Sequence, residues 1–316
     1  MVEFDRSQVT VYLCISVIYS LIGIPANILS LTFFLKKQGK YHISRFIFIL
    51  LNLTDLLICL CFILVSASYI SLLREGEFVE SPTYCPVYLA AFPTAQQFSV
   101  FITAVLCLIR TASIVKPIFN IPKRVVFGII TSYLCLIITR VILLFKNTSL
   151  QASFRPQSLK CGWEMVKTGQ LADFSRVSFI LISLILVPSV LGCLLTICTL
   201  HRSSQQFPIS PEKRSATVTV MILTAICLTA SSTFVAERIM RMKGVEVSAL
   251  MENIALQFAY SFTCVANPAV YFIRLRKLRQ FVRDLFTKMT KKRRRNLSRR
   301  AKTVRVSLLA EETTRL

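Results

Sequence analysis

Asp55 is the one carboxylate that stands well inside a long apolar run of this sequence. A charged side chain at the centre of a bilayer costs about 2.5–3.5 kcal/mol, so Asp55 needs a partner or a function. Asn27, Ser99 and Asn267 lie at similar depths in three other apolar runs. With water, these side chains could hold a small cation such as sodium beside Asp55, or share its proton. The alternative is a neutral aspartic acid whose hydrogen bonds hold the helices together.

Arg110 is a second residue with chemical potential, because it lies near the end of an apolar run. Glu212 opens a later run and is expected on the same side of the membrane, so the two could pair across the bundle. The alternative is that Arg110 only extends its side chain toward the lipid headgroups.

Long membrane-spanning helices must position these residues. Of 316 residues, 54% are hydrophobic and 17% are charged, which excludes a disordered chain, and the length excludes a small disulfide-rich secreted domain. The net charge of +23 is typical of nucleic-acid binders, but those proteins do not carry long uncharged apolar runs. We therefore expect no nucleic acid as a partner.

Apolar runs long enough to cross a bilayer, about 20 residues each, occur seven times. They are Val9–Leu35, Ile43–Leu73, Cys85–Val115, Val125–Phe145, Val177–Leu200, Ala216–Ala236 and Asn253–Ile273. The sequence predicts an all-α membrane protein, a seven-transmembrane helix bundle within residues 9–273.

The distribution of charge predicts the orientation of these spans. Lysine and arginine gather in the loops after the first, third and fifth runs and in the tail, whereas acidic residues lie mainly on the other side. Because basic residues favour the cytoplasmic face, we expect a short extracellular N-terminus at residues 1–8 and a cytoplasmic C-terminus. The plasma membrane is the expected location.

Nine of the eleven cysteines fall inside apolar runs, where a thiol behaves as a small buried hydrophobe. The other two, Cys85 and Cys161, belong to the predicted extracellular side, which is oxidising. Their disulfide would stabilise the fold by roughly 4–5 kcal/mol as an upper figure; the alternative is two free thiols. Asn147-Thr148-Ser149 in the same region is a glycosylation sequon, so Asn147 is a candidate acceptor.

The last span and the segment after it carry two further motifs. Asn267-Pro268-Ala269-Val270-Tyr271 places an amide, a helix kink and a phenol together. Residues 274–290 then repeat apolar side chains every three or four positions, which predicts an amphipathic helix on the membrane surface. The basic tail at 291–316 is expected to bind anionic lipids of the inner leaflet.

In this order, the motifs resemble those of rhodopsin-like (family 1) G-protein-coupled receptors over about residues 9–290. The matching residues are Gly23, Asn27, Leu51-Asn52-Leu53-Thr54-Asp55, Cys85, Arg110, Cys161, Pro188 and Asn267-Pro268-Ala269-Val270-Tyr271. The resemblance implies a receptor that binds an extracellular ligand and activates a heterotrimeric G protein, with arrestin as a further partner. It implies no enzymatic activity.

The resemblance also assigns roles to individual residues. Arg110 would be the switch that meets the G protein, and Tyr271, with Asn267 and Pro268, would move inward on activation. Asp55, Ser99 and Asn267 would form a sodium pocket, Cys85 and Cys161 the extracellular disulfide, and the amphipathic segment the eighth helix. No other cofactor is implied.

Several positions depart from the family pattern. Ile109 stands where an acidic residue usually precedes the arginine, and Thr196 stands where a tyrosine is common. The fourth span has no tryptophan, and the sixth lacks the usual tryptophan and proline. These departures indicate a divergent member, of an invertebrate orphan, peptide or chemosensory type.

The family's ligand pocket would be lined by residues of the third and seventh spans, with aromatic and amide side chains and no internal charge. They are Tyr88, Phe92, Gln96, Gln257 and Ser261. Phe92 replaces the aspartate of amine receptors, and the seventh span has no lysine to hold retinal. A peptide or a neutral small molecule is the expected ligand. The competing interpretations are a transporter or channel, although no internal repeat supports it, and a receptor-like protein that does not couple.

Overall fold

A computed structural model describes residues 6–36, 43–75, 84–115, 122–146, 150–155, 160–165, 187, 190–198, 211–243, 245, 254–288 and 290–291. The chain divides into two compact units, Met1–Tyr271 and Phe272–Leu316, and each is described by itself. The described part is almost entirely helical, as the sequence predicts.

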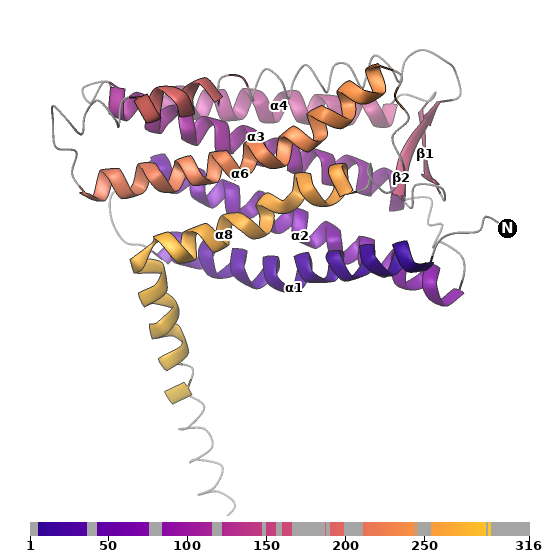
Figure 1. Ribbon diagram of the computed structural model, residues 1–316, viewed down its shortest axis with the longest axis horizontal. Coiled ribbons are helices and arrows are strands. Elements are labelled where there is room, and N and C mark those ends of the chain that lie inside the picture. The colour runs from indigo at the N-terminus through magenta and orange to yellow at the C-terminus, as the bar shows by residue number, and fades with distance from the viewer. Residues whose placement is uncertain are drawn as a thin grey trace, which may run out of the picture. The chain divides into compact units, whose positions relative to one another are not determined.

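The first unit contains the long helices (Figure 1). They are α1 (Arg6–Lys36), α2 (Ile43–Glu75), α3 (Tyr84–Val115), α4 (Lys123–Lys146), residues 190–198, α6 (Pro211–Met242), η2 (Ile254–Ala259), η3 (Tyr260–Phe262) and α8 (Thr263–Arg274), the last ending just inside the second unit. The predicted fifth span, Val177–Leu200, is described only at residues 187 and 190–198, and the remainder lies outside the described residues.

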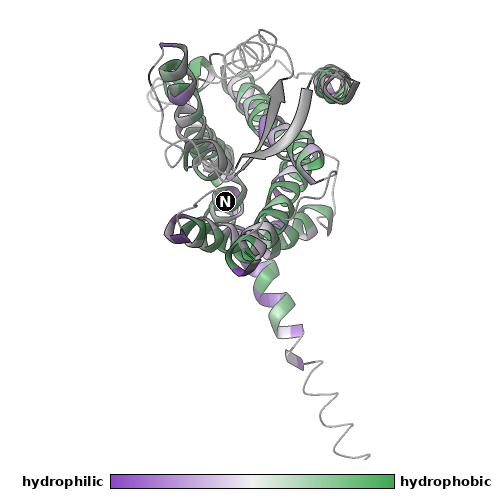
Figure 2. Cartoon of the chain, turned by 90° about the vertical axis from the view of Figure 1, so that its right-hand side faces the viewer, coloured by the Kyte–Doolittle hydropathy of each residue, from purple (hydrophilic) through white to green (hydrophobic). Residues whose placement is uncertain are grey.

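Side chains are distributed inside out relative to a water-soluble protein. Leucine and isoleucine residues are widely exposed, with Leu21 at 70% and Leu35 at 56%, whereas Ser16, Asn27 and Asn52 are fully buried. Hydrophobic residues predominate along the long helices (Figure 2). This is the pattern of helices that face lipid and join through small or polar residues. Four of the described helices, α1, α2, α3 and α6, are long and apolar enough to cross a membrane.

Helices α1 and α2 pack closely along their lengths, and Gly23 makes this approach possible. A Cβ atom added at Gly23 would lie 2.3 Å from the Cys59 sulfur on α2 and 3.6 Å from Val265 Cγ2 on α8. Only a residue without a side chain therefore fits where α1 meets these two helices.

The last span is irregular rather than a single α-helix. It begins as the π-helix η2, tightens into the 3-10 turn η3, and continues as α8. Such changes of pitch often accompany functional sites because they rotate the side chains that follow. The hydroxyl of Tyr19 on α1 donates a hydrogen bond to the carbonyl of Phe258 within η2, at 3.1 Å.

A short antiparallel hairpin interrupts the helical pattern. Strands β1 (Leu150–Arg155) and β2 (Lys160–Met165) pair so that Phe154 faces Cys161. The sequence analysis did not predict these strands. They are short, and their pairing depends on two separate segments meeting rather than on a long periodic pattern.

The second unit contains a helix at residues 276–288. The Arg279 guanidinium donates hydrogen bonds to the carbonyls of Phe272 and Ile273, which end the preceding helix. Leu278 is buried while Arg276 and Lys277 are exposed, so the helix is amphipathic as predicted. Beyond Lys291, the basic tail lies outside the described residues.

Replacing Gly23 with Ala is expected to destabilise the protein by about 1–3 kcal/mol, because the new methyl group overlaps the Cys59 sulfur. Thermal unfolding in detergent micelles measures the loss. Gly128→Ala in α4 is the control, because nothing described lies within 4 Å of its added Cβ; it should be neutral or stabilising. Equal losses in both variants would contradict this account of the α1–α2 contact.

Candidate functional site

The Asp55 carboxylate lies at the centre of the first unit and is completely buried. Ser99 Oγ of α3 donates a hydrogen bond to Asp55 Oδ1 at 2.9 Å, and Asn267 Nδ2 of α8 donates to Oδ2 at 2.7 Å. One side chain of α2 therefore connects three helices. We call Asp55, Ser99 and Asn267 the polar core.

Asn27 has different partners from those the sequence analysis considered. Its Nδ2 donates to the carbonyl of Gly23 at 2.9 Å and to the carbonyl of Cys264 at 2.8 Å, and it lies 3.9 Å from the Cys59 sulfur. Pro268, four residues after Cys264, has no N–H to donate to that carbonyl. Asn27 satisfies the group that the proline leaves free and so ties α1 to α8.

Two buried oxygen atoms near this region accept no hydrogen bond from any described residue. They are Asn27 Oδ1 and Asn267 Oδ1. Buried polar atoms of this kind ordinarily bind water or an ion. The Asp55 carboxylate and the Asn267 amide oxygen are hard oxygen donors, which fit an alkali cation such as sodium. In the described part of the chain, no cluster of three or more His, Cys, Asp or Glu side chains could hold a metal ion.

Arg110 lies near the C-terminal end of α3, and its side chain is half buried. Its Nε atom is buried and has no hydrogen-bond partner among the described residues. Ile109, which replaces the family's acidic residue, is 7% exposed and offers no charge. The Glu212 side chain lies outside the described residues, so its pairing with Arg110 stays a prediction.

Tyr271 packs among aromatic rings of α1 and α2. Its ring meets Phe34 at 5.7 Å and Phe48 at 5.3 Å between centroids, edge to face in both cases. The side chain is fully buried, and its hydroxyl has no hydrogen-bond partner within the described residues. The Tyr271 ring, which the sequence places close to the predicted helix kink at Pro268, is therefore surrounded by aromatic side chains.

A contact between α3 and residues 190–198 was missed by the sequence analysis. The hydroxyls of Thr111 and Thr196 are 2.7 Å apart, and each lies near the carbonyl of Gly192, at 3.1 and 2.8 Å. One turn along α3, the sulfur atoms of Cys107 and Cys193 are 3.6 Å apart. Threonine and cysteine belong to no motif, so only the packing of the two helices reveals the contact.

The predicted pocket residues of α3 are buried, with Tyr88, Phe92 and Gln96 each 4–6% exposed. Tyr88 stacks on Phe92 at 5.0 Å, and Gln96 Nε2 donates a hydrogen bond to Ser261 Oγ. The side chain of Gln257 lies outside the described residues.

Two rings that the sequence analysis did not select extend this aromatic group. Phe62 of α2 meets Phe92 edge to face at 5.3 Å and stacks on Phe258 of η2 at 6.0 Å. Only the packing of α2 and η2 against α3 brings these rings together.

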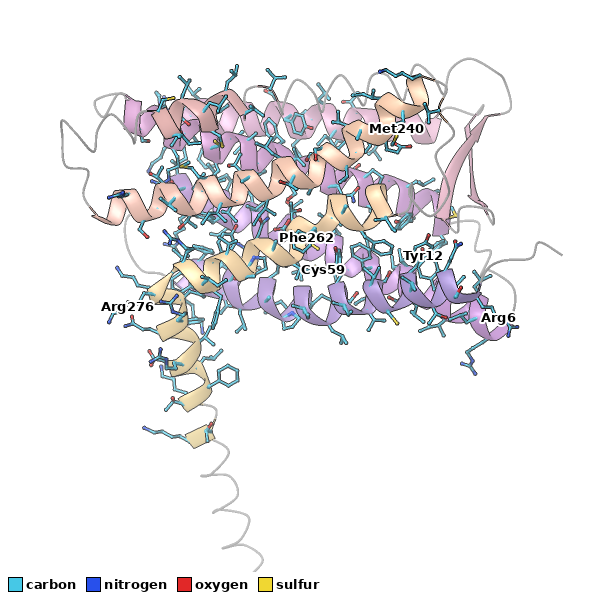
Figure 3. All side chains as sticks on the ribbon, viewed as in Figure 1. Arg6, Tyr12, Cys59, Met240, Phe262 and Arg276 are labelled. Atoms are coloured by element: carbon cyan, nitrogen blue, oxygen red, sulfur yellow. A yellow bond between two sulfur atoms is a disulfide. The ribbon has the colours of Figure 1, made fainter. Side chains whose placement is uncertain are left out.

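Glu237 directly follows the predicted sixth span, Ala216–Ala236, and is 1% exposed in the structure. Figure 3 shows Met240, three residues later, at the end of the bundle where β1 and β2 lie. Glu237 continues the buried stripe of Cys227, Ala230 and Phe234 on α6. This spacing of three and four residues could have revealed its burial. A carboxylate therefore lies on the buried face of α6.

The predicted disulfide between Cys85 and Cys161 is present and joins the start of α3 to β2. It holds the hairpin at the end of α3 from which Tyr88 and Phe92 project. Asn147, the candidate glycosylation site, lies outside the described residues.

Comparison with known proteins shows the fold. No protein-family model matches the sequence, and no curated protein matches it significantly. Among solved structures, the chain is similar to squid rhodopsin, with a TM-score of 0.71 and 14% sequence identity over 92% of this chain and 88% of that one.

The fold is thus a seven-transmembrane helix bundle of the kind seen in squid rhodopsin. This fold and the four described helices that are long and apolar enough to cross a membrane support a multi-pass membrane protein.

Asn27→Leu is expected to destabilise the protein by about 1–3 kcal/mol, because it leaves the buried Cys264 carbonyl without a donor. In the Pro268→Ala background an N–H becomes available to that carbonyl, so the same substitution should cost less. A double-mutant cycle by thermal unfolding measures the difference. An equal cost in both backgrounds would show that Asn27 does not act through the proline.

Proposed function

We propose that this protein is a divergent rhodopsin-like receptor that binds an extracellular ligand and activates a heterotrimeric G protein at its cytoplasmic face. The observation that carries the proposal is the polar core, in which Asp55 joins α2, α3 and α8 through Ser99 and Asn267. A change at one helix is thereby transmitted to two others. The charge distribution supports an extracellular N-terminus and a cytoplasmic C-terminus in the plasma membrane.

The mechanism is a shift between two arrangements of the bundle. A ligand that binds one arrangement more tightly raises its population, and a G protein that binds the same arrangement is coupled to the ligand. Arg110 is the proposed contact for the G protein. Tyr271 is the proposed moving part, because its buried hydroxyl has no described partner in this arrangement and would gain one by moving.

The pocket proposed for the ligand lies among Tyr88, Phe92, Gln96, Gln257 and Ser261. Aromatic rings and amide groups suit a peptide or a neutral small molecule. The last span, 254–274, contains no lysine, so a retinal Schiff base is not proposed. The departures in the sixth span support an invertebrate orphan, peptide or chemosensory type.

Further partners are proposed from the sequence. Arrestin would bind the cytoplasmic side, anionic inner-leaflet lipids the basic tail at 291–316, and a glycan Asn147. The second candidate is a receptor-like protein that does not couple, favoured by the absence of the tryptophan and proline of the sixth span.

Glu212→Ala is expected to raise ligand-free signalling severalfold, because with Ile109 beside it Arg110 would be restrained mainly by Glu212. A cell-based G-protein activation assay, normalised to surface expression, measures the effect. Lys213→Ala is the neighbouring control and should leave the signal unchanged.

Arg110→Ala should abolish the raised signal when it is combined with Glu212→Ala. Unchanged basal signalling in Glu212→Ala would count against the pairing. A ligand response that persists in Arg110→Ala would instead favour a transporter or channel.

Sodium is proposed to bind at the polar core, held by Asp55, Ser99 and Asn267. When bound, the ion would neutralise the buried carboxylate and stabilise the arrangement that contains it. Sodium chloride should therefore raise the unfolding temperature of the purified protein relative to choline chloride at equal concentration. At ten times the dissociation constant, the stabilisation is about 1.4 kcal/mol.

Asp55→Asn should remove this sodium dependence. Asp284→Asn is the matched control, because Asp284 is an exposed carboxylate of the second unit, and it should retain the dependence. Sodium stabilisation that survives in Asp55→Asn would exclude the polar core as the site.

A further inference from the structure

Two thiols on different helices lie at contact distance near Arg110. The sulfur atoms of Cys107 on α3 and Cys193 on the helix at 190–198 are 3.6 Å apart, and neither residue forms a disulfide. A disulfide bond is about 2.05 Å long, so the sulfurs need approach by only about 1.5 Å. The remaining question is whether the helices hold the thiols in this position.

The backbone contact around the pair is close. A Cβ atom added at Gly192 would lie 3.3 Å from Leu108 Cδ2 and 3.6 Å from the Cys107 sulfur. The absence of a side chain at Gly192 thus allows the two helices to approach each other where the thiols lie. An ordinary residue at this position would force the neighbouring side chains to move.

Hydrogen bonds fix the relative position of the helices one turn further along. Thr111 and Thr196 are joined through their hydroxyls at 2.7 Å, and both hydroxyls also lie within hydrogen-bond distance of the Gly192 carbonyl. Since Thr111 is four residues after Cys107 and Thr196 three after Cys193, these bonds hold the two sulfurs opposite each other. We call Cys107, Thr111, Gly192, Cys193 and Thr196 the α3 latch.

We propose that Cys107 and Cys193 are a redox modification site. A membrane-permeant hydroperoxide oxidises the two thiols to a reversible disulfide, which links α3 covalently to the helix at 190–198. Cys193 is partly exposed whereas Cys107 is 2% exposed, so the oxidant reaches Cys193 first. The Cys193 thiol takes one oxygen atom from hydrogen peroxide and becomes a sulfenic acid, releasing one water molecule. The Cys107 sulfur then displaces that oxygen, forming the S–S bond and a second water molecule.

The two thiols lose two electrons in total and the peroxide gains two, so no other reactant is needed. A dithiol reductant reverses the reaction by thiol–disulfide exchange. The regulatory consequence rests on the proposed receptor function. A covalent bond between α3 and the neighbouring helix, one turn from Arg110, favours the arrangement in which the thiols touch and so opposes movement of α3 against that helix.

The test treats the full-length protein in membranes with hydrogen peroxide, blocks the remaining thiols, and searches for the Cys107–Cys193 linked peptide by mass spectrometry. The linked peptide is expected in the wild type and in Cys198→Ser, and should disappear in Cys193→Ser. Cys198 is the matched control because it lies on the same helix and is exposed. Absence of the linked peptide while Cys198 is oxidised would overturn the proposal.

A second variant tests whether the Cys107 and Cys193 thiols react because the helices hold them together or because they meet by chance. Thr196→Val keeps the size of the side chain but removes the hydroxyl of the latch, so it should slow formation of the linked peptide at least threefold. Thr229→Val, which removes an exposed hydroxyl on α6, should not change the rate. Equal rates in all three proteins would show that the latch does not hold the thiols.

Thermal unfolding supplies a readout that does not depend on G-protein coupling. Oxidation is expected to raise the unfolding temperature of the wild type by at least about 3 °C, and dithiothreitol should reverse the rise. Failure of coupling would leave these results unchanged. If coupling is intact, a linked receptor that signals as strongly as the reduced one would overturn the regulatory consequence alone.

Discussion

A polar group inside a bilayer must find its partner within the protein, because the surrounding lipid offers none. Asp55 meets this requirement by accepting hydrogen bonds from Ser99 and Asn267, which brings α2, α3 and α8 to one point. The Cys264 carbonyl receives no hydrogen bond from Pro268, which has no N–H, and instead accepts one from Asn27. This bond connects α1 to α8. Lipid tails are as apolar as leucine, so burial of leucine does not select which helix faces meet. These few hydrogen bonds, together with close contacts such as that at Gly23, determine the arrangement.

The two ends of α3 differ in how they are held. At one end the disulfide joins α3 to the hairpin, and a continuous group of aromatic rings packs beside it. Near Arg110, the described contacts are hydroxyl and thiol pairs, and buried polar atoms of Arg110 and Tyr271 have no described partner. A buried group that lacks a hydrogen-bond partner in one arrangement is stabilised by any other arrangement that provides one.

Two of the departures from the pattern of rhodopsin-like receptors lie near Arg110. Ile109 and Thr196 both lie at this end of the bundle, and Thr196 takes part in the α3 latch instead of providing a phenol. The chain thus retains the arginine but surrounds it with neutral groups in the described part of the site. No carboxylate stands next to the arginine in the sequence, and the nearest described hydrogen bonds between helices are those of Thr111 and Thr196.

Much of the fold was predictable because lipid imposes a simple rule on each segment separately. A helix that crosses a bilayer must be long and apolar, and both properties are local to the segment, so hydropathy located α1, α2, α3 and α4 closely. Helix α6 extends beyond its predicted span, Ala216–Ala236, to Pro211–Met242 because its ends are polar. The disulfide was predictable because Cys85 and Cys161 were the two cysteines assigned to the extracellular side. The amphipathic helix at 276–288 was predictable from its repeat of apolar residues.

What the sequence by itself determined, then, was the spans, their polar residues and the disulfide. Only the tertiary structure decided that Asn27 donates to Cys264 rather than to Asp55, and that Cys107 meets Cys193. The physical reason is that hydropathy fixes the length of a helix but not its rotation or its neighbours. Those follow from contacts between residues that are distant in the chain, here 237 positions apart for Asn27 and Cys264.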